Sequence, residues 1–202
     1  MIVYTASGRR LELTEPPLGQ GGEGAVYRLT AYPERVAKIY RQDAESHRQK
    51  IEAMVSLSDA VEARPTLRNV AWPLAALYAD PQATAFVGFG MRAVDRAFGM
   101  DELYEYPAPA GMSVSMAEKV DYLIGLAGVV DELHSLGQVV GDFNDNNLAM
   151  TRVGGQVALV DVDSFHATIG GRTYRCEVCM SGYMAPELIR AVRGTTFRDC
   201  PG

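Results

Sequence analysis

A glycine-rich segment near the N-terminus restricts the fold of this 202-residue chain more than any other feature. Residues 19–24 read Gly-Gln-Gly-Gly-Glu-Gly and fit the pattern G-x-G-x-x-G. A dinucleotide-binding fingerprint would lead from a strand into a helix, and a P-loop would end in Gly-Lys-Ser/Thr. Here the next residues, 25–29, have the strand-like composition Ala-Val-Tyr-Arg-Leu. The pattern therefore predicts a glycine loop between two antiparallel strands, with an ordinary flexible turn as the alternative.

The first half of the chain reads as a small sheet with one helix. Residues 36–40 predict a strand after 25–29, with the turn at Pro33 and Glu34, and residues 70–91 predict two more strands around Asp80-Pro81. A helix is predicted within 43–57, which has no glycine or proline and carries apolar residues at Ile51, Met54, Val55 and Leu57.

The second half contains the clearest helix signal. Ser115 and Glu118 form a capping box, apolar residues recur at helical spacing from Met116 to Leu133, and Gly137 predicts the end. Short strands are predicted at 139–140 and 157–160. The loop-like region 92–114 predicts a boundary between a domain of residues 1–95 and a domain of residues 96–202.

Composition narrows the class of protein. A formal net charge of −6 argues against a nucleic-acid partner. The sequence has no apolar run long enough for a membrane span and no signal-peptide pattern at its start, so we expect a soluble cytoplasmic protein. Cys176 and Cys179 have zinc-ligand spacing, but a zinc site usually needs a second pair, and we interpret them as thiols in a loop.

The candidate chemical groups follow one another at suggestive spacings. Lys38 lies in Val-Ala-Lys-Ile, fourteen residues after Gly24. Asp142 and Asn147 lie five residues apart, and Asp161 follows fourteen residues later in Leu-Val-Asp-Val-Asp. Any one of these polar residues could be a surface charge or a turn former, but the joint spacing is hard to obtain by chance.

These motifs resemble those of protein kinases, specifically the eukaryotic-like Ser/Thr protein kinases of bacteria. The segment 133–147 resembles the end of a kinase helix running into the catalytic loop, and residues 183–188, Tyr-Met-Ala-Pro-Glu-Leu, resemble the end of an activation segment that would span 164–184. The resemblance implies an α+β, bilobal kinase fold. Its N-lobe would be an antiparallel β-sheet plus one helix, and its C-lobe would be mainly helical and apparently truncated.

The resemblance also implies roles, with ATP and Mg²⁺ (or Mn²⁺) as cofactors. Asp142 takes the place of the base, and Lys38 that of the phosphate-binding lysine, paired with Glu52 or, as the alternative, Glu45. The adenine-binding hinge would lie near 90–93. The implied metal ligands are Asn147, Asp161 and Asp163, and the implied nucleotide contacts are Gly19, Gly21, Gly22, Gly24, Val26, Ala37, Lys38, Glu52 and Leu148.

The sequence departs from the family pattern in four places. Gly141 replaces the arginine before the catalytic aspartate, so we predict activity that does not depend on phosphorylation of the activation segment. Asn144, predicted as a catalytic residue, replaces a lysine, and the loss of such a contact typically costs about 2–4 kcal/mol. Asp163 replaces a glycine, which predicts a metal-competent resting state. The chain ends soon after Glu187, which indicates a piece of a longer protein or an unusually small lower lobe.

Three functions remain open at this stage. The leading one is an active kinase that phosphorylates Ser or Thr of a protein substrate. Kinases of this branch often accompany a partner phosphatase or a von Willebrand A-type protein, or carry helix-hairpin-helix extensions. The second is a pseudokinase that binds ATP as a scaffold or sensor, and the third is a small-molecule kinase with the same lobes.

Overall fold

The computed structural model describes residues 1–94, 98–103, 114–151, 155–176, 181–184, 186 and 189. It divides into two compact units. The first unit comprises residues 1–64 and 71–93, and the second comprises residues 65–70 and 94–202. Across the described ranges, no helix has the length and apolar character needed to span a membrane.

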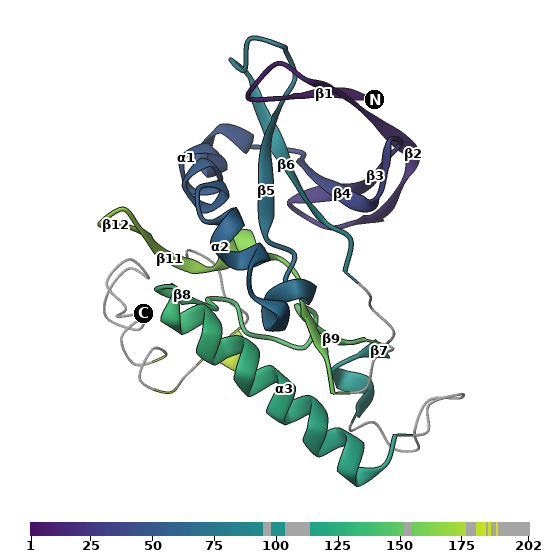
Figure 1. The fold of residues 1–202 in the computed structure, drawn as a ribbon, viewed down its shortest axis with the longest axis vertical. Helices are drawn as coiled ribbons and strands as arrows, with labels where there is room; N and C mark the ends of the chain where they lie inside the picture. The colour runs from purple at the N-terminus through teal and green to yellow at the C-terminus, as the bar shows by residue number, and fades with distance from the viewer. Residues whose placement is uncertain are drawn as a thin grey trace. The chain divides into compact units, whose positions relative to one another are not determined.

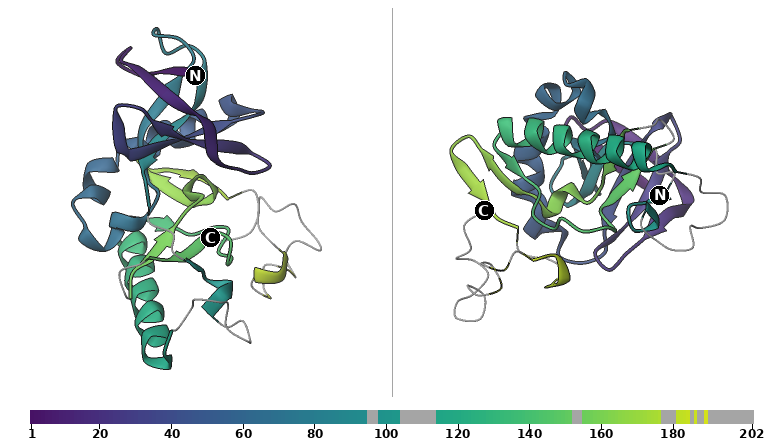
Figure 2. Two further views of the ribbon diagram at one scale, coloured as in Figure 1. Left: turned by 90° about the vertical axis from the view of Figure 1, so that its right-hand side faces the viewer. Right: turned by 90° about the horizontal axis from the view of Figure 1, so that it is seen from below.

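The first unit is a closed antiparallel barrel in the strand order β1-β2-β3-β4-β6-β5 (Figures 1 and 2). The predicted strands are confirmed, but the implied sheet closes into a barrel because β1 pairs with both β2 and β5. The strands are β1 (Ile2–Thr5), β2 (Arg10–Gln20), β3 (Gly24–Leu29), β4 (Tyr32–Tyr40), β5 (Pro73–Tyr78) and β6 (Phe86–Arg92).

A buried apolar cluster fills the barrel. Its members come from five strands and alternate with side chains that point the other way, as the two-residue period of a strand requires. They are Val3, Leu13, Leu29, Ala37 and Leu77.

The turn between β3 and β4 differs from the prediction. It falls at residues 30–31, whereas Pro33 and Glu34 lie inside β4. The pairing runs from Leu29↔Tyr32 to Arg28↔Val36, so the register shifts across this stretch. A proline is tolerated there because it lacks an N–H and an irregular register leaves that position without a ladder bond.

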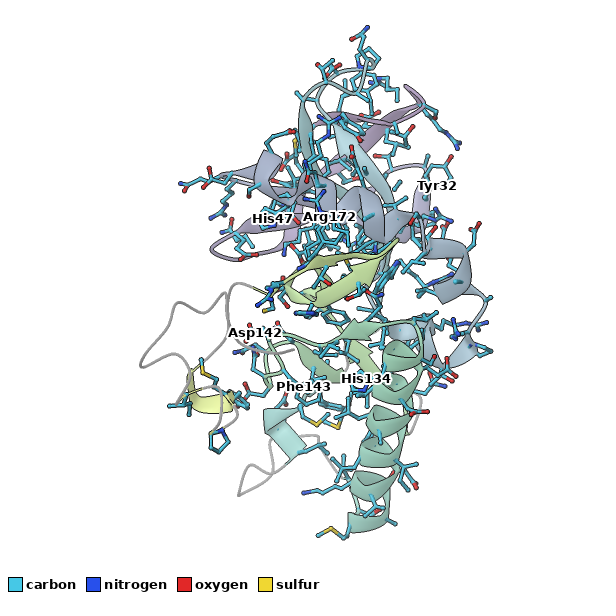
Figure 3. All side chains as sticks on the ribbon, turned by 90° about the vertical axis from the view of Figure 1, so that its left-hand side faces the viewer. Tyr32, His47, His134, Asp142, Phe143 and Arg172 are labelled. Atoms are coloured by element: carbon cyan, nitrogen blue, oxygen red, sulfur yellow. The ribbon has the colours of Figure 1, made fainter. Side chains whose placement is uncertain are left out.

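The predicted helix is confirmed as α1 (Ala44–Val55), and a short α2 (Ser58–Glu62) that the sequence did not suggest follows it. Helix α1 packs beside β5 and β6 (Figure 1). Ile51 and Met54 are completely buried, and the indole of Trp72 donates a hydrogen bond to the Met54 carbonyl at 3.0 Å. His47, labelled in Figure 3, stacks on Tyr40 with ring centroids 4.4 Å apart.

The second unit holds two three-stranded sheets, β10-β9-β7 and β12-β11-β8. Within its described residues it is not mainly helical, which corrects the expectation: one long helix accompanies short strands and 3-10 turns. The elements are η1 (Pro65–Asn69), β7 (Phe98–Gly99), η2 (Asp101–Leu103), α3 (Met116–Ser135), β8 (Gln138–Val139), β9 (Leu148–Met150), β10 (Val157–Leu159), η3 (Val162–Ser164), β11 (His166–Ile169), β12 (Arg172–Tyr174) and η4 (Ser181–Tyr183).

Helix α3 begins and ends where the sequence predicts. The Ser115 side chain accepts from the Glu118 N–H and the Glu118 side chain accepts from the Ser115 N–H, which confirms the capping box. Gly137 follows the helix with φ of 72°, a conformation that favours glycine. The buried face carries Tyr122, Val129 and Leu133, whereas Met116, Val120, Leu123 and Ile124 are exposed. The apolar spacing therefore predicted the helix but not its buried side.

Candidate functional site

The glycine loop joins two antiparallel strands, as predicted. Gly19 pairs with Val26 and Gln20 with Ala25, and the Gly21 N–H donates to the Gly24 carbonyl at 2.9 Å. A two-residue turn, Gly22-Glu23, closes the hairpin. The strand on its C-terminal side excludes the dinucleotide-binding arrangement, in which a helix would follow.

The four glycines of the loop differ in whether packing requires a residue without a side chain. A Cβ on Gly24 would lie 2.5 Å from the Ile39 carbonyl oxygen, so close approach of β4 requires glycine there. A Cβ on Gly19, Gly21 or Gly22 would meet no atom within 4 Å, and none of these has a positive φ. Packing within the described residues thus explains only Gly24, and the other three leave open backbone that a ligand can approach.

Lys38 is a buried cation on β4. It lies between Val26 of β3 and Phe89 of β6 and is 8% exposed. Its Nζ is 3.5 Å from Oε2 of Glu23, in the glycine loop, and 5.5 Å from the ring centroid of Tyr40. A buried ammonium is costly unless an opposite charge accompanies it, so this position suits an anionic ligand or side chain.

Ala37 does not share the face of Lys38, and its role in nucleotide binding stays a prediction. Successive residues of a strand point to opposite faces, and Ala37 belongs to the buried cluster inside the barrel. Val26, directly opposite Lys38, does share its face. The residue on β4 that sequence reasoning missed is Val36, two positions before Lys38, and the period of two could have identified it.

The predicted pair between Lys38 and Glu52 is replaced by a different network. Oε1 of Glu52 accepts from Arg48 Nε at 2.8 Å and from the Tyr78 hydroxyl at 2.7 Å. Glu45, the alternative partner, lies 3.3 Å from the same Arg48. Both glutamates lie three or four residues from Arg48 on α1, the spacing at which helical side chains meet. They therefore pair with Arg48 and not with Lys38.

This network shifts two pKa values. Burial raises the pKa of Glu52, but hydrogen bonds from Tyr78 and Arg48, with the charge of Arg48, bring it below its ordinary value. Burial, followed by the hydrogen bond to Glu52, raises the pKa of Tyr78 to about 12. The network therefore holds a carboxylate and a neutral phenol together at physiological pH.

The loop between β8 and β9 holds Asp142, labelled with Phe143 in Figure 3. The Asn147 amide Nδ2 donates to the Asp142 carbonyl at 3.0 Å and to Oδ2 of Asp142 at 3.3 Å. This orients the Asp142 carboxylate from within the loop. Because Nδ2 is engaged, Oδ1 of Asn147 is the atom that remains to bind a cation.

Asn144 supports the loop through hydrogen bonds to its backbone, and its catalytic role stays a prediction. It is 3% exposed, and its Oδ1 accepts from the backbone N–H groups of Asn146 at 2.9 Å and Asn147 at 3.3 Å. Its Nδ2 lies 3.4 Å from the Asp142 carbonyl. A short amide that bonds to the following backbone is a common turn device.

Asp161, the second candidate metal ligand, lies near Asn147 because strands β9 and β10 pair with each other. Leu148 of β9 pairs with Leu159 of β10, and the Val160 N–H donates to the Asn147 carbonyl at 3.0 Å. Asp161 therefore follows directly at the same end of the hairpin. Its backbone is left-handed, with φ of 59° and ψ of 41°, and its carbonyl accepts from the Ser164 hydroxyl at 2.7 Å.

The remaining predicted residues of this unit are buried. Leu148 is 4% exposed and Asp163 is 5% exposed. Asn147, Asp161 and Asp163 offer one amide oxygen and two carboxylates, a set of hard oxygen donors that fits Mg²⁺ or Mn²⁺. This fit is chemical, and whether Asp163 reaches a cation stays a prediction.

Gly141 is required by packing. A Cβ at this position would overlap the Ser164 carbonyl oxygen and the Cβ of Cys176, and would lie 2.5 Å from its Sγ. Any larger residue before Asp142, arginine included, would have to displace these neighbours. Of the predicted end of the activation segment, Ala185, Glu187 and Leu188 lie outside the described residues, as do Cys179 and Cys200.

The comparisons with known proteins support a kinase-like protein. The chain is 34% identical over 194 residues to Protein kinase YegI of Escherichia coli O157:H7 and 33% identical over 192 residues to Protein kinase YegI of Escherichia coli strain K12. Each match covers 92% of this chain, which spans 28% of the length of each relative. No family model matches the chain.

Proposed function

We propose that the chain is a kinase domain that transfers the γ-phosphoryl group of ATP, with Mg²⁺ or Mn²⁺, to Ser or Thr hydroxyls of a protein. The first unit would act as the N-lobe and the second as part of the C-lobe. The similarity to proteins named protein kinase supports the general class. The protein substrate and the cytoplasmic location remain part of the proposal, as do a partner phosphatase and a von Willebrand A-type partner.

The observation that carries the proposal is the hydrogen-bonded link between Asp142, Asn147 and the strand end at Asp161. The Asn147 side chain holds Asp142, while the Asn147 carbonyl holds Val160. The residues that we propose as base and metal ligands thus belong to one hydrogen-bonded loop and hairpin. Phosphoryl transfer needs this, because its catalysis is mostly positioning and charge stabilisation.

Each group would have one task. The bound metal would neutralise phosphate charge, with Asn147 and Asp161 as its ligands. Asp142 would orient the acceptor hydroxyl and accept its proton. In the first unit, Lys38 would hold phosphate oxygens under the open glycine loop.

The test uses labelled ATP and Mg²⁺ with a generic protein substrate. We expect label on protein with the wild type, and a loss of at least about a hundredfold with Asp142→Ala and Asp161→Ala. Glu34→Gln, which changes an exposed glutamate of β4, is the control and should retain activity. Label that persists in both aspartate variants would refute the proposal.

Two other functions give different results in the same assay. ATP binding without transfer to any acceptor would indicate the pseudokinase, which the loss of the family's lysine at position 144 favours. Transfer only when small alcohols are added would indicate a small-molecule kinase, which the Asp-x-Asp sequence at 161–163 favours.

A further inference from the structure

The glycine loop carries a carboxylate, that of Glu23. This carboxylate forms an ion pair with Lys38, the residue that we propose holds the nucleotide phosphates. Glu23 is the second residue of the loop's two-residue turn, and its Oε2 is 3.5 Å from Lys38 Nζ. The Lys38 side chain is 10% exposed, whereas that of Glu23 is 47% exposed. A half-exposed carboxylate thus reaches inward to a buried ammonium.

We propose that Glu23 occupies Lys38 in the nucleotide-free protein and must give way when the phosphates of ATP bind. This rests on the proposed function and adds a residue that controls nucleotide affinity. A carboxylate and a phosphate oxygen seek the same donor in the same geometry. Burial makes a counter-charge for Lys38 valuable at all times, so a phosphate can take the place of the Glu23 carboxylate.

The backbone of the loop lets the Glu23 side chain leave without unfolding the hairpin. The Glu23 carbonyl accepts from the Arg41 N–H at 2.9 Å, and the Arg41 guanidinium donates to Gln20 Oε1 at 2.6 Å. Both bonds use groups other than the Glu23 carboxylate. A rotation of that side chain toward solvent therefore breaks the ion pair with Lys38 while the hairpin stays paired.

Charge gives the direction of the effect. With ATP bound, the Glu23 carboxylate and the triphosphate carry like charges close to one cation, and binding also breaks the ion pair. Both terms weaken ATP binding. Glu23→Gln removes the charge but keeps the size of the side chain, so it should strengthen ATP binding.

The experiment compares ATP and adenosine by isothermal titration calorimetry, with and without Mg²⁺. We expect Glu23→Gln to lower the Kd of ATP about two- to fivefold in both conditions, the size of a partly exposed ion pair. Adenosine, which has no phosphate, should bind the variant and the wild type equally. Glu34→Gln is the matched control, because Glu34 is an exposed glutamate 3.8 Å from a neighbouring cation, Arg35, on β4.

A second variant tests whether Glu23 changes the ATP affinity through its ion pair with Lys38. If Glu23 acts through Lys38, Glu23→Gln should give a smaller further change when Lys38 is already methionine, because the ion pair is then gone and only the repulsion between Glu23 and the phosphates remains. Equal ATP affinity of wild type, Glu23→Gln and Glu34→Gln would overturn this inference alone. Weaker binding by Glu23→Gln only when Mg²⁺ is present would overturn it in favour of a metal-contacting glutamate. No ATP binding by the wild type would overturn the inference and the proposed function together.

Discussion

Replacing Asn144 by alanine tests whether this residue builds the loop or faces the reacting phosphate. Alanine removes Oδ1, the acceptor for two backbone N–H groups. The Asn147 N–H keeps a second acceptor, the Asn144 carbonyl at 3.2 Å, whereas the Asn146 N–H loses its 2.9 Å hydrogen bond to Oδ1. Removing one partner of a buried hydrogen bond costs about 1–3 kcal/mol, and we take this as the expected loss of stability.

That loss converts into two measurable changes. For a chain of this size, each kcal/mol lowers the melting temperature by about 2–4 °C, so Asn144→Ala should melt about 2–12 °C lower. If the loop must be ordered to transfer phosphate, the same loss lowers the rate up to about a hundredfold. Asn144→Asp keeps an acceptor oxygen of similar shape and should lose less stability than alanine. Gln82→Ala, which removes an exposed side-chain amide elsewhere in the chain, is the control and should melt within about 1 °C of the wild type.

The lysine variant decides between the two roles. Asn144→Lys restores the residue that the kinase resemblance implies, at a position that is 3% exposed. A buried ammonium there would lose the acceptor and gain a desolvation cost, so the variant should be less stable and no faster. A folded Asn144→Lys protein that transfers phosphate faster than the wild type would refute the loop-building role.

Three further predictions concern single contacts. In Gly88→Ala the new Cβ would overlap the Lys38 carbonyl, so urea unfolding should show a loss of about 1–3 kcal/mol; Gly90→Ala, whose nearest neighbour atom is 3.9 Å away, should lose much less. Gly141→Arg, which restores the family residue, should lower the melting temperature instead of raising activity, and a stable, more active variant would contradict this. The lowered pKa of Glu52 contributes stability that is present above its ordinary value of 4.5 and lost as pH falls through the lower folded value; urea titrations should show a smaller loss below pH 4.5 in Glu52→Gln.

Local sequence signals predicted a helix or strand well where the whole signal lies within that element. The capping box at Ser115 and the glycine at 137 act within one helix end, so their meaning does not depend on distant residues. The strands β9, β11 and β12 were missed because three or four residues carry too little pattern to distinguish a strand from a loop. Closure of the barrel was also missed, since it depends on β1 pairing with β5 across seventy residues.

The candidate site residues were chosen by their spacing, and the structure differs from the prediction in the partner that some side chains take. Glu52 has the spacing of a lysine partner, yet Arg48 lies one helical turn away and Tyr78 lies on the adjacent strand. Ala37 was assigned by its neighbour in the motif, but strand alternation sends it into the core. Partner choice is decided by three-dimensional neighbours, which a spacing rule does not contain.

Gly141 and Asn144, which depart from the kinase pattern, bear on whether the loop between β8 and β9 has lost its function during evolution. A residue lost by decay would leave a cavity or a buried polar group without a partner. Position 141 instead lies tightly against Ser164 and Cys176, and the amide of Asn144 bonds to the loop's own backbone. Each substitution is accommodated by its neighbours, so the loop that holds Asp142 and Asn147 is built around these residues. This packing favours a loop maintained for a function over a remnant of one.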